Sequence, residues 1–415
     1  MRGMLVLVLV CFCLLPAGCI LWSLVPSGRE LHFFSGPGSI GFYYSPPTLV
    51  GGYVYVGTGR GFHHDVADNN RFYKLDLKLG KVWEYPLGKN EVRGGAALDD
   101  AGNVYFVVHE GREAGVARSG VLFLYSLDNS GRFRWSRAID SSPHELGMSN
   151  PAIAADNTIY VGGDRFYAFD SDGNVKWAWG SGLNVMNAPI IDRHGNVYFN
   201  ACGAVVSLGR NGNERWQSAA SGEWFSSPAF SVDFSRVFAA VGDTVFCFDA
   251  VSGARVWGFA PAGIVGAFRA TPAVDDHDNV YIGTKADKSS VFYAIRADGS
   301  GLLWKRDVGA DLYSSPALGD DRTVYVGSEI SDARGTRLHA FDMATGDTKW
   351  SSSLRADVTW SSPAISDEGV LYIASMGFAG SDGGVYAFRT DSKGLLPNAG
   401  SPRFHGGNAS TGRRK

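Results

Sequence analysis

Apolar and polar positions alternate in short stretches along most of the chain, and turn residues separate the stretches. In a typical phrase, "SSPALGDDRTVYVG" at residues 314–327, a short apolar segment is followed by a Gly- and Asp-rich turn and an alternating segment. Asp, Asn and Gly favour turns, and alternating β-branched and aromatic residues predict strands. Equivalent phrases occupy residues 45–57, 94–107, 149–162, 187–200, 226–240, 270–283, 314–327 and 361–374.

A second phrase follows most of these and ends in tryptophan, as in "HAFDMATGDTKW" at residues 339–350. It reads as a third strand, a tight turn and the start of a fourth strand. The recurring residues are Trp83, Trp135, Trp177, Trp216, Trp257, Trp304 and Trp350. Repeated four-stranded units of this length are typical of β-propellers. We therefore predict an all-β fold, an eight-bladed β-propeller of four-stranded antiparallel blades over residues 29–396, with the tryptophans filling the space between blades.

The eighth unit lacks the fourth strand and its tryptophan, because "LLPNAGSPRFHGG" follows its third strand. The segment "RELHFFS" at residues 29–35 resembles the start of a fourth strand and precedes the first unit. We predict that this N-terminal strand completes the last blade, which would leave no sheet edge open in the ring. Residues 397–415 then form a C-terminal tail.

Residues 1–28 have the features of an export signal, with Arg2 ahead of a long apolar run. The segment "LPAGC" resembles the lipobox of bacterial lipoproteins and makes Cys19 the candidate for lipidation. Two alternatives remain open: an uncleaved anchor over residues 4–26, which is long enough to span a bilayer, or simple cleavage. Each of the three predicts an exported protein, and the first makes it a membrane-anchored lipoprotein facing the periplasm or the cell surface.

Composition adds two constraints. The net charge is −3 and charged residues make up 19% of the chain, so the basic surface of a nucleic-acid binder is not expected. Outside the leader only Cys202 and Cys247 remain, both in apolar strand-like contexts. They are predicted to be buried free thiols, with a single disulfide as the alternative.

The repeats resemble the PQQ-like β-propeller repeat family, whose hallmark Ala-x-Asp-x-x-Thr-Gly-x-x-x-Trp is present in full as Ala340, Asp342, Thr345, Gly346 and Trp350. This resemblance implies one of two roles. One branch contains dehydrogenases that bind pyrroloquinoline quinone and calcium, typically with adjacent cysteines. The other is non-enzymatic and includes the lipoprotein of the outer-membrane barrel-assembly machinery. The body of this chain has no adjacent cysteines, so the resemblance favours the second branch, with no enzymatic activity and no cofactor.

The loops that lead into the first strand of each blade should surround the mouth of the central channel. One residue from each loop gives a set rich in aromatic residues, Met and Arg, which are enriched at protein interfaces: Tyr44, Arg93, Met148, Met186, Phe225, Arg269, Tyr313 and Trp360. We predict that this ring binds a protein partner in the cell envelope; the alternative is that its members pack between blades. The chain would act as a protein-binding scaffold, with outer-membrane protein assembly as a candidate process. The other candidates are a dehydrogenase-like enzyme and a ligand-sensing ectodomain.

Metal ligands are weakly indicated. Loops 58–72 and 108–122, on the same face as the mouth, carry the largest groups of candidates: His63, His64, Asp65, His109 and Glu110. Histidines are common in surface loops, so no metal site is expected. The segment "DDHDN" at residues 275–279 lies at a recurring hairpin turn and is interpreted as a turn.

Overall fold

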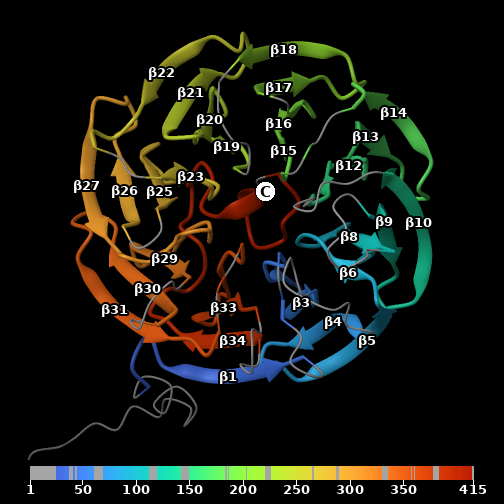
Figure 1. Cartoon of the computed structure of the whole chain (residues 1–415), viewed down its shortest axis with the longest axis horizontal. Helices are drawn as coiled ribbons and strands as arrows, with labels where there is room; N and C mark the ends of the chain where they lie inside the picture. The colour runs from blue at the N-terminus through green and yellow to red at the C-terminus, as the bar shows by residue number, and fades with distance from the viewer. Residues whose placement is uncertain are drawn as a thin grey trace, which may run out of the picture.

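The computed structural model describes residues 25–36, 41–42, 44–59, 69–111, 119–141, 149–182, 185, 187–201, 203–219, 226–263, 266–286, 289–329, 335–356, 358, 360–376 and 383–413. Within these residues the strands form eight antiparallel sheets arranged as a ring (Figure 1), which confirms the predicted eight-bladed β-propeller. Each blade runs from its innermost strand outwards, and most blades contain four strands.

The strands of blades 1 to 4 follow one another along the chain. Their bounds are β2 (Thr48–Val50), β3 (Tyr53–Gly57), β4 (Asn70–Asp76) and β5 (Lys81–Gly88) in blade 1; β6 (Glu91–Val92), β7 (Ala97–Leu98), β8 (Val104–Glu110), β9 (Val121–Leu127) and β10 (Phe133–Asp140) in blade 2; β11 (Ala152–Ile153), β12 (Ile159–Gly162), β13 (Phe166–Phe169) and β14 (Val175–Trp179) in blade 3; and β15 (Ile190–Ile191), β16 (Val197–Ala201), β17 (Ala204–Leu208) and β18 (Glu214–Ala219) in blade 4.

Blades 5 to 8 repeat the arrangement, except that the outer strand of blade 8 comes from the N-terminus. The bounds are β19 (Ala229–Phe230), β20 (Arg236–Val241), β21 (Thr244–Asp249) and β22 (Arg255–Phe259) in blade 5; β23 (Ala267–Phe268), β24 (Ala273–Val274), β25 (Val280–Lys285), β26 (Val291–Ile295) and β27 (Leu302–Asp307) in blade 6; β28 (Ala317–Leu318), β29 (Thr323–Ser328), β30 (Arg337–Asp342) and β31 (Thr348–Ser353) in blade 7; and β32 (Ala364–Ile365), β33 (Val370–Ala374), β34 (Gly384–Arg389) and β1 (Glu30–Ser35) in blade 8.

The predicted closure of the ring is confirmed. Strand β1 pairs antiparallel with β34, from Glu30 opposite Phe388 to Ser35 opposite Gly384. The closure also has side-chain contacts, since Arg355 of the preceding blade bonds Glu30 at 2.7 Å. The last blade therefore joins the two ends of the chain, as the blue and red strands at the bottom of Figure 1 show.

The recurring tryptophans join neighbouring blades, as predicted. In six of the seven, the indole Nε1 donates a hydrogen bond of 2.8–3.1 Å to a carbonyl in the turn between the third and fourth strands of the next blade. The ring lies against a glycine of that turn; a Cβ on Gly346, whose φ is +72°, would approach Trp304 to 2.5 Å. The pairs of indole and carbonyl are Trp83–Asn129, Trp135–Ser171, Trp177–Arg210, Trp216–Ala250, Trp257–Ala297 and Trp304–Met343.

This contact explains why the repeat couples a turn glycine to a tryptophan. The glycine of one blade must lack a side chain because the indole of the preceding blade occupies that space. At the closure, the N-terminal segment supplies the equivalent residue, since Gly28 (φ +83°) lies against Trp350. The recurring Thr-Gly…Trp segment therefore has a structural role, which is to join neighbouring blades.

The C-terminal segment runs inside the ring rather than outside it (Figure 1). It contains one short 3₁₀ helix, η1 (Phe404–Gly406), and its backbone bonds the innermost strands directly: Leu318 N donates to Pro402 O at 2.7 Å. Hydrogen bonds from inner-strand N–H groups to the tail reach blades 1 and 3 to 8. Five are accepted by tail carbonyls, from Leu49, Ile153, Ile191, Val274 and Leu318, and two by the side chains of Ser401 and Asn408, from Phe230 and Ile365. Blade 2 is reached by an ion pair of 3.6 Å between Arg413 and Asp100. The tail predicted at residues 397–415 thus fills the axis of the propeller.

Candidate functional site

The structure describes five of the eight residues predicted around the mouth of the channel. They belong to five consecutive blades in the order 6, 7, 8, 1 and 2, and they are Arg269, Tyr313, Trp360, Tyr44 and Arg93. The other three, Met148, Met186 and Phe225, lie outside the described residues. The candidate site is therefore described over the five blades that also carry the longer loops of the sequence.

Three aromatic side chains in this arc touch one another, and we call Tyr44, Tyr313 and Trp360 the aromatic lip. The ring centroid of Trp360 lies 4.9 Å from that of Tyr313 and 6.1 Å from that of Tyr44. Tyr44 and Trp360 both have a left-handed backbone, with φ of +62° and +61°. Such a backbone is strained for a bulky residue by roughly 1–3 kcal/mol and is found mainly at binding and active sites.

Two arginines of this set, Arg93 and Arg269, differ in how deeply they are buried. Arg93 is buried, pairs with the buried Glu91 at 2.9 Å, and places its guanidinium 5.2 Å from the ring of Tyr44. Tyr44 is itself buried, with 2% of its surface exposed. Arg269, Tyr313 and Trp360 are partly exposed. Arg93 and Tyr44 therefore support the wall of the mouth, whereas the other three form its accessible surface.

A cavity of about 30 Å³, which we call the axial well, is lined by the three residues of the lip and by Arg269. Its wall is formed by small polar residues from successive blades: Asn150, Asn187, Ser227, Thr271, Ser315 and Ser362. Phe404 of the tail also lines it. A cavity of this size has room for one or two water molecules or a group of similar size.

The polar wall contains a run of hydrogen bonds that links blades 4 to 7. The Ser227 hydroxyl accepts from Ala188 N at 2.8 Å, and Ser315 accepts from Thr271 N at 2.9 Å. Thr271 accepts in the same way from Ser227 N at 3.0 Å. Sequence reasoning missed these residues, although the recurring Ser or Thr before Pro in "SSPA" and "ATPA" was a signal for them.

The preceding residue of the same phrase bonds within its own blade. Ser45, Ser149, Ser314 and Ser361 accept from the backbone N–H of Gly57, Gly162, Gly327 and Ala374, at 2.8–3.2 Å. In blade 7 a pair of hydroxyl residues therefore holds the inner strand twice, because Ser314 bonds its own blade and Ser315 bonds the neighbouring one. This arrangement fixes the loops that carry the mouth residues.

Two ionisable residues of the tail lie below the axial well and are completely buried. Arg403 donates to the carbonyls of Pro363 and Ser362 in blade 8 and of Pro47 in blade 1, at 2.8–3.4 Å. It thereby joins the first and last blades from inside. His405 contacts Pro189 O through Nε2 at 2.8 Å, which requires the Nε2–H tautomer.

Burial of His405 gives a prediction for acid stability. Burial lowers the pKa of His405 to about 3, and nearby Arg403 acts in the same direction, against the opposing effect of the hydrogen bond that His405 donates to Pro189 O. In the unfolded chain this pKa returns to about 6.5. Between these values only the unfolded state binds the proton, so the free energy of unfolding falls as the pH falls below 6.5, by up to about 1.4 kcal/mol per pH unit.

Urea unfolding at pH 6.5 and pH 4.5 measures this contribution. We expect His405→Gln, which keeps an N–H donor but does not titrate, to lose about 2–3 kcal/mol less than the parent over this interval. All other titrating groups are shared, so the difference isolates His405. Equal losses in the two proteins would contradict a neutral, buried imidazole at this position.

The structure tests the metal candidates only in part. His63, His64 and Asp65 lie outside the described residues. His109 is buried with Nε2 2.8 Å from Ser119 O, and Glu110 accepts a hydrogen bond from Tyr125. These two neighbouring residues on β8 therefore already have protein partners.

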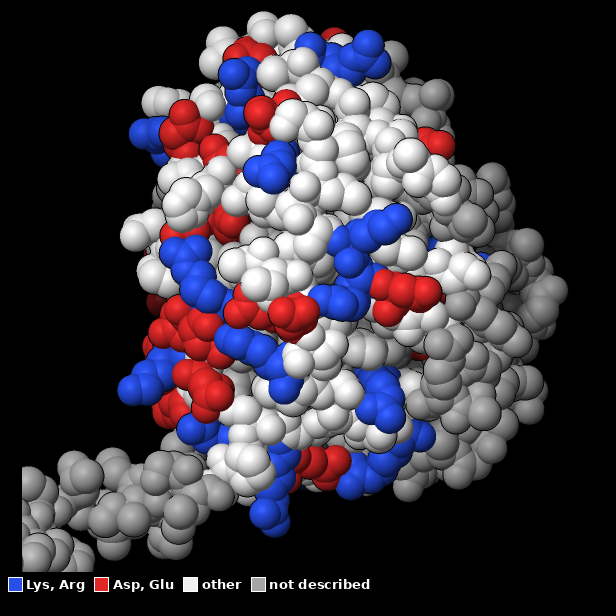
Figure 2. All heavy atoms as spheres, turned by 90° about the vertical axis from the view of Figure 1, so that its left-hand side faces the viewer, with Lys and Arg blue, Asp and Glu red and all other residues white. Residues whose placement is uncertain are grey.

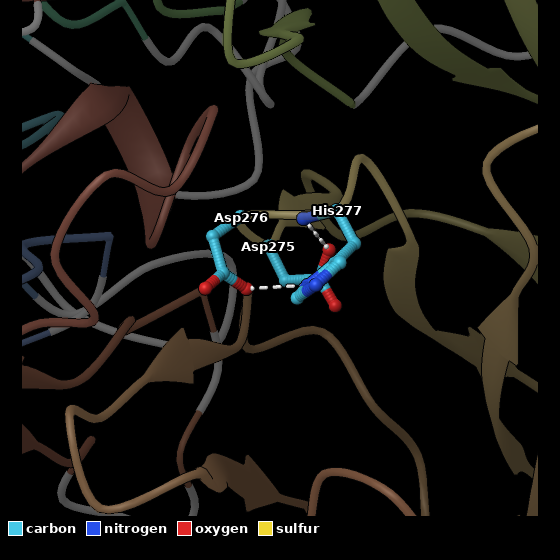
Figure 3. Close-up of side chains that lie close together, drawn as sticks. All are labelled: Asp275, Asp276 and His277. Carbon is cyan, nitrogen blue, oxygen red and sulfur yellow. Dashed lines mark hydrogen bonds and ion pairs between the residues drawn. The ribbon is translucent and has the colours of Figure 1, made fainter.

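Asp275, Asp276 and His277 come close enough to offer ligand atoms to a metal, and Figure 3 shows them together. Their carboxylates are already used. Asp275 accepts from the backbone N–H groups of His277 and Asn279 at 2.8 and 2.9 Å, and Asp276 pairs with Arg322 at 2.6 and 2.7 Å. Equivalent turns in blades 2 and 4 use Asp99 with Asn103 and Asp192 with Asn196 in the same way. The predicted turn is confirmed.

Cys247 is a buried free thiol, as predicted, and burial raises its pKa to about 12. Cys202 and Cys19 lie outside the described residues, as does most of the predicted anchor. Within the part of the chain that the structure describes, no helix is both long and apolar enough to cross a membrane.

The side of the ring that includes β22 and β27 carries charges of both signs (Figure 2). Positive and negative side chains are interspersed there, and several pair between blades, such as Arg306 with Asp347 at 3.0 Å. This side lacks the continuous basic surface that nucleic-acid binding requires.

The fold of the chain is similar to those of several solved structures, and these proteins have different roles. The propeller of BamB from Moraxella catarrhalis superimposes with a TM-score of 0.63 at 14% identity, covering 87% of this chain and 99% of that one. A europium-containing methanol dehydrogenase gives 0.64 at 13% identity, with 87% and 93% covered. The quinohemoprotein alcohol dehydrogenase from Comamonas testosteroni gives 0.61 at 14% identity, with 90% and 77% covered. At these identities the likeness establishes the fold alone.

Sequence comparison is more specific. No protein of curated function matches the chain. The family described as outer membrane protein assembly factor BamB, however, matches residues 80–240 and 241–396, which together span most of the propeller. The chain therefore belongs to the family of the outer membrane protein assembly factor BamB, within the PQQ-like β-propeller repeat proteins.

Proposed function

We propose that the protein is an exported, membrane-tethered scaffold that binds a protein partner in the cell envelope and works in outer-membrane protein assembly. Family membership supports the process, because the family is described by an assembly factor. The leader sequence, with Cys19 as its lipidation site, supports export and tethering.

The observation that carries partner binding is the aromatic lip. Two bulky residues in direct contact, Tyr44 and Trp360, are both held in a strained backbone beside a partly exposed tyrosine and arginine. Trp, Tyr and Arg are the residues that dominate binding energy at protein interfaces.

The runner-up function is a dehydrogenase-like enzyme, which the shared fold with two dehydrogenase structures favours. The axial well, at about 30 Å³, is smaller than the roughly 300–1,000 Å³ usual for cofactor and small-molecule sites, which supports the scaffold at the mouth. A larger cavity of about 390 Å³ lies between the tail and blades 1 and 8.

A membrane pull-down tests the scaffold. We expect Arg269→Ala with Trp360→Ala to remove the main co-purifying envelope protein, since loss of hot-spot residues costs about 2 kcal/mol or more, roughly thirtyfold in affinity. The matched control is Phe133→Ala with Arg210→Ala, which removes one exposed aromatic side chain and one exposed arginine far from the mouth. Circular dichroism should show cooperative thermal unfolding for both variants. A double mouth variant that is folded and keeps every partner would disprove the mouth as the binding site.

A further inference from the structure

The cavity of about 390 Å³ lies where blades 8 and 1 close the ring, and we call it the closure cavity (Figure 1). Its wall is formed by residues 49–52 and 77 of blade 1, 366–368 of blade 8, and 406–411 and 413 of the tail. The strand ends in this wall are opposite to those that lead into the mouth. The closure cavity is therefore on the other face of the ring, and its volume is within the roughly 300–1,000 Å³ usual for small-molecule sites.

The closure cavity exists because the first turn of blade 1 is short. At two other junctions this turn bonds the same turn of the next blade: Val232 N donates to Asp278 at 2.7 Å between blades 5 and 6, and Asp276 pairs with Arg322 at 2.6 Å between blades 6 and 7. In blade 1 the turn consists of the two glycines at 51–52 alone. A Cβ on either glycine would meet no atom within 4 Å. The junction of blades 8 and 1 therefore has open space where these junctions have bonded side chains.

Blade 8 supplies hydrogen-bond acceptors to the closure cavity. The carboxylates of Asp367 and Glu368 line it, and both residues are exposed. Neither carboxylate has a hydrogen bond or an ion pair with any residue that the structure describes. The equivalent of Asp367 in blade 7 is Asp320, which accepts from Lys393 N at 2.7 Å. Blade 8 therefore leaves two carboxylates available to a ligand.

The tail supplies hydrogen-bond donors to the same cavity. The backbone N–H groups of Gly407, Asn408 and Ala409 have no acceptor among the described residues. The Nε atom of Arg413 is buried and also lacks a described hydrogen-bond partner, whereas a terminal nitrogen of the same guanidinium pairs with Asp100 at 3.6 Å. Buried donors without a partner are rare in folded proteins. The tail therefore presents several unused donors, while the charge of Arg413 is already opposed by Asp100.

This combination restricts the chemistry of the ligand. The ligand must donate to the carboxylates of blade 8 and accept from N–H groups that are spread along the tail. A hydroxyl group does both, whereas a simple anion would be repelled by the carboxylates and a simple cation would leave the donors of the tail unused. Leu49, Val50 and Leu77 add a partly buried apolar wall that suits C–H groups. A small molecule with many hydroxyl groups on a carbon skeleton meets all of these requirements.

We propose that the closure cavity binds a saccharide of one or two rings. Its hydroxyl groups donate to Asp367 and Glu368 and accept from the tail, including the Nε–H of Arg413. Its C–H groups pack against Leu49 and Leu77. Because the closure cavity and the mouth lie on opposite faces, the saccharide and a protein partner can be bound at the same time. This inference goes beyond the scaffold function and does not depend on it.

Isothermal titration calorimetry tests the proposal, with the full chain in micelles of a detergent that has no sugar headgroup. The probes are maltose and N,N′-diacetylchitobiose, and we expect saturable binding of at least one of them in the millimolar range or tighter. Asp367→Asn with Glu368→Gln should weaken binding about tenfold, because hydrogen bonds to charged groups are lost. Arg413→Lys should weaken it by a similar factor, because it keeps the charge beside Asp100 but removes the Nε donor. The matched control is Asp172→Asn, which removes an exposed turn carboxylate of blade 3 outside the cavity and should leave binding unchanged.

Three results would overturn the proposal. The first is no binding of either disaccharide. The second is binding that the carboxylate and Arg413 variants leave unchanged, which would locate it elsewhere on the protein. The third is tighter binding of putrescine or glycylglycine than of both disaccharides, which would assign the cavity to a cation or a zwitterion. The tetrasaccharide of the disaccharide that binds then separates two sources of the ligand: equal affinity indicates the end of a longer glycan, and loss of binding indicates a free disaccharide.

Discussion

Removing residues 397–415 will abolish cooperative unfolding of the propeller. The tail bonds the innermost strands of blades 1 and 3 to 8, and Arg413 reaches blade 2. Each hydrogen bond of this kind, accepted by a carbonyl or a side chain of the tail, contributes about 1 kcal/mol net. Seven such bonds together are comparable to the roughly 5–15 kcal/mol that keep a typical domain folded. The deletion also removes Arg403, which joins blade 1 to blade 8 from inside.

The measurement is thermal and urea unfolding followed by tryptophan fluorescence, since tryptophans lie at successive junctions between blades. We expect a broad, non-cooperative transition or aggregation. The control is a chain that ends at Arg413, which keeps every bond described here. If the truncated chain stays monomeric and unfolds with an unchanged midpoint, the tail does not stabilise the ring.

The repeat carried most of the information about the fold. A turn glycine and a tryptophan at fixed spacing, such as Gly346 and Trp350, predicted strand order and the packing between blades because each has a local sequence signature. The closing strand was predictable for the same reason, since residues 29–35 resemble an outer strand without a partner in their own unit. The turn glycine, the tryptophan and the outer strand each depend on residue types that fit only one position in a blade.

The site was harder to predict because the burial of a side chain and its bonding partners depend on residues that are distant in the sequence. Arg93 and Arg269 hold equivalent positions in the sequence, yet one is buried against Glu91 and the other is partly exposed. The polar wall of the axial well was hard to predict for a similar reason. Thr271 accepts its hydrogen bond from the backbone N–H of Ser227, which lies 44 residues away in the sequence. The tail has no alternation of apolar residues, and five of its seven bonds to inner-strand N–H groups use backbone carbonyls, which any sequence can provide.

The second large effect is expected at the outer closure. Deleting residues 29–35 removes β1 and exposes the whole edge of β34, from Gly384 to Arg389. An open edge with unpaired backbone groups promotes aggregation. The deletion also removes Phe33, which packs 4.8 Å from the ring of Tyr386 and 4.1 Å from the Arg355 guanidinium. We expect an aggregating protein, or one with a lower midpoint and no single cooperative transition.

Restoring the strand in trans separates the missing edge from general damage to the chain. A synthetic peptide of residues 25–36 carries β1 together with Gly28, whose contact with Trp350 completes the last junction between blades. It should restore a monomeric protein with a cooperative transition, whereas a peptide of the same composition in scrambled order should not. Light scattering and thermal unfolding measure both outcomes. A deletion variant that remains monomeric with the parent's midpoint would mean that the inner bonds of the tail, made by Arg403 and Asn408 to blades 1 and 8, close the ring by themselves.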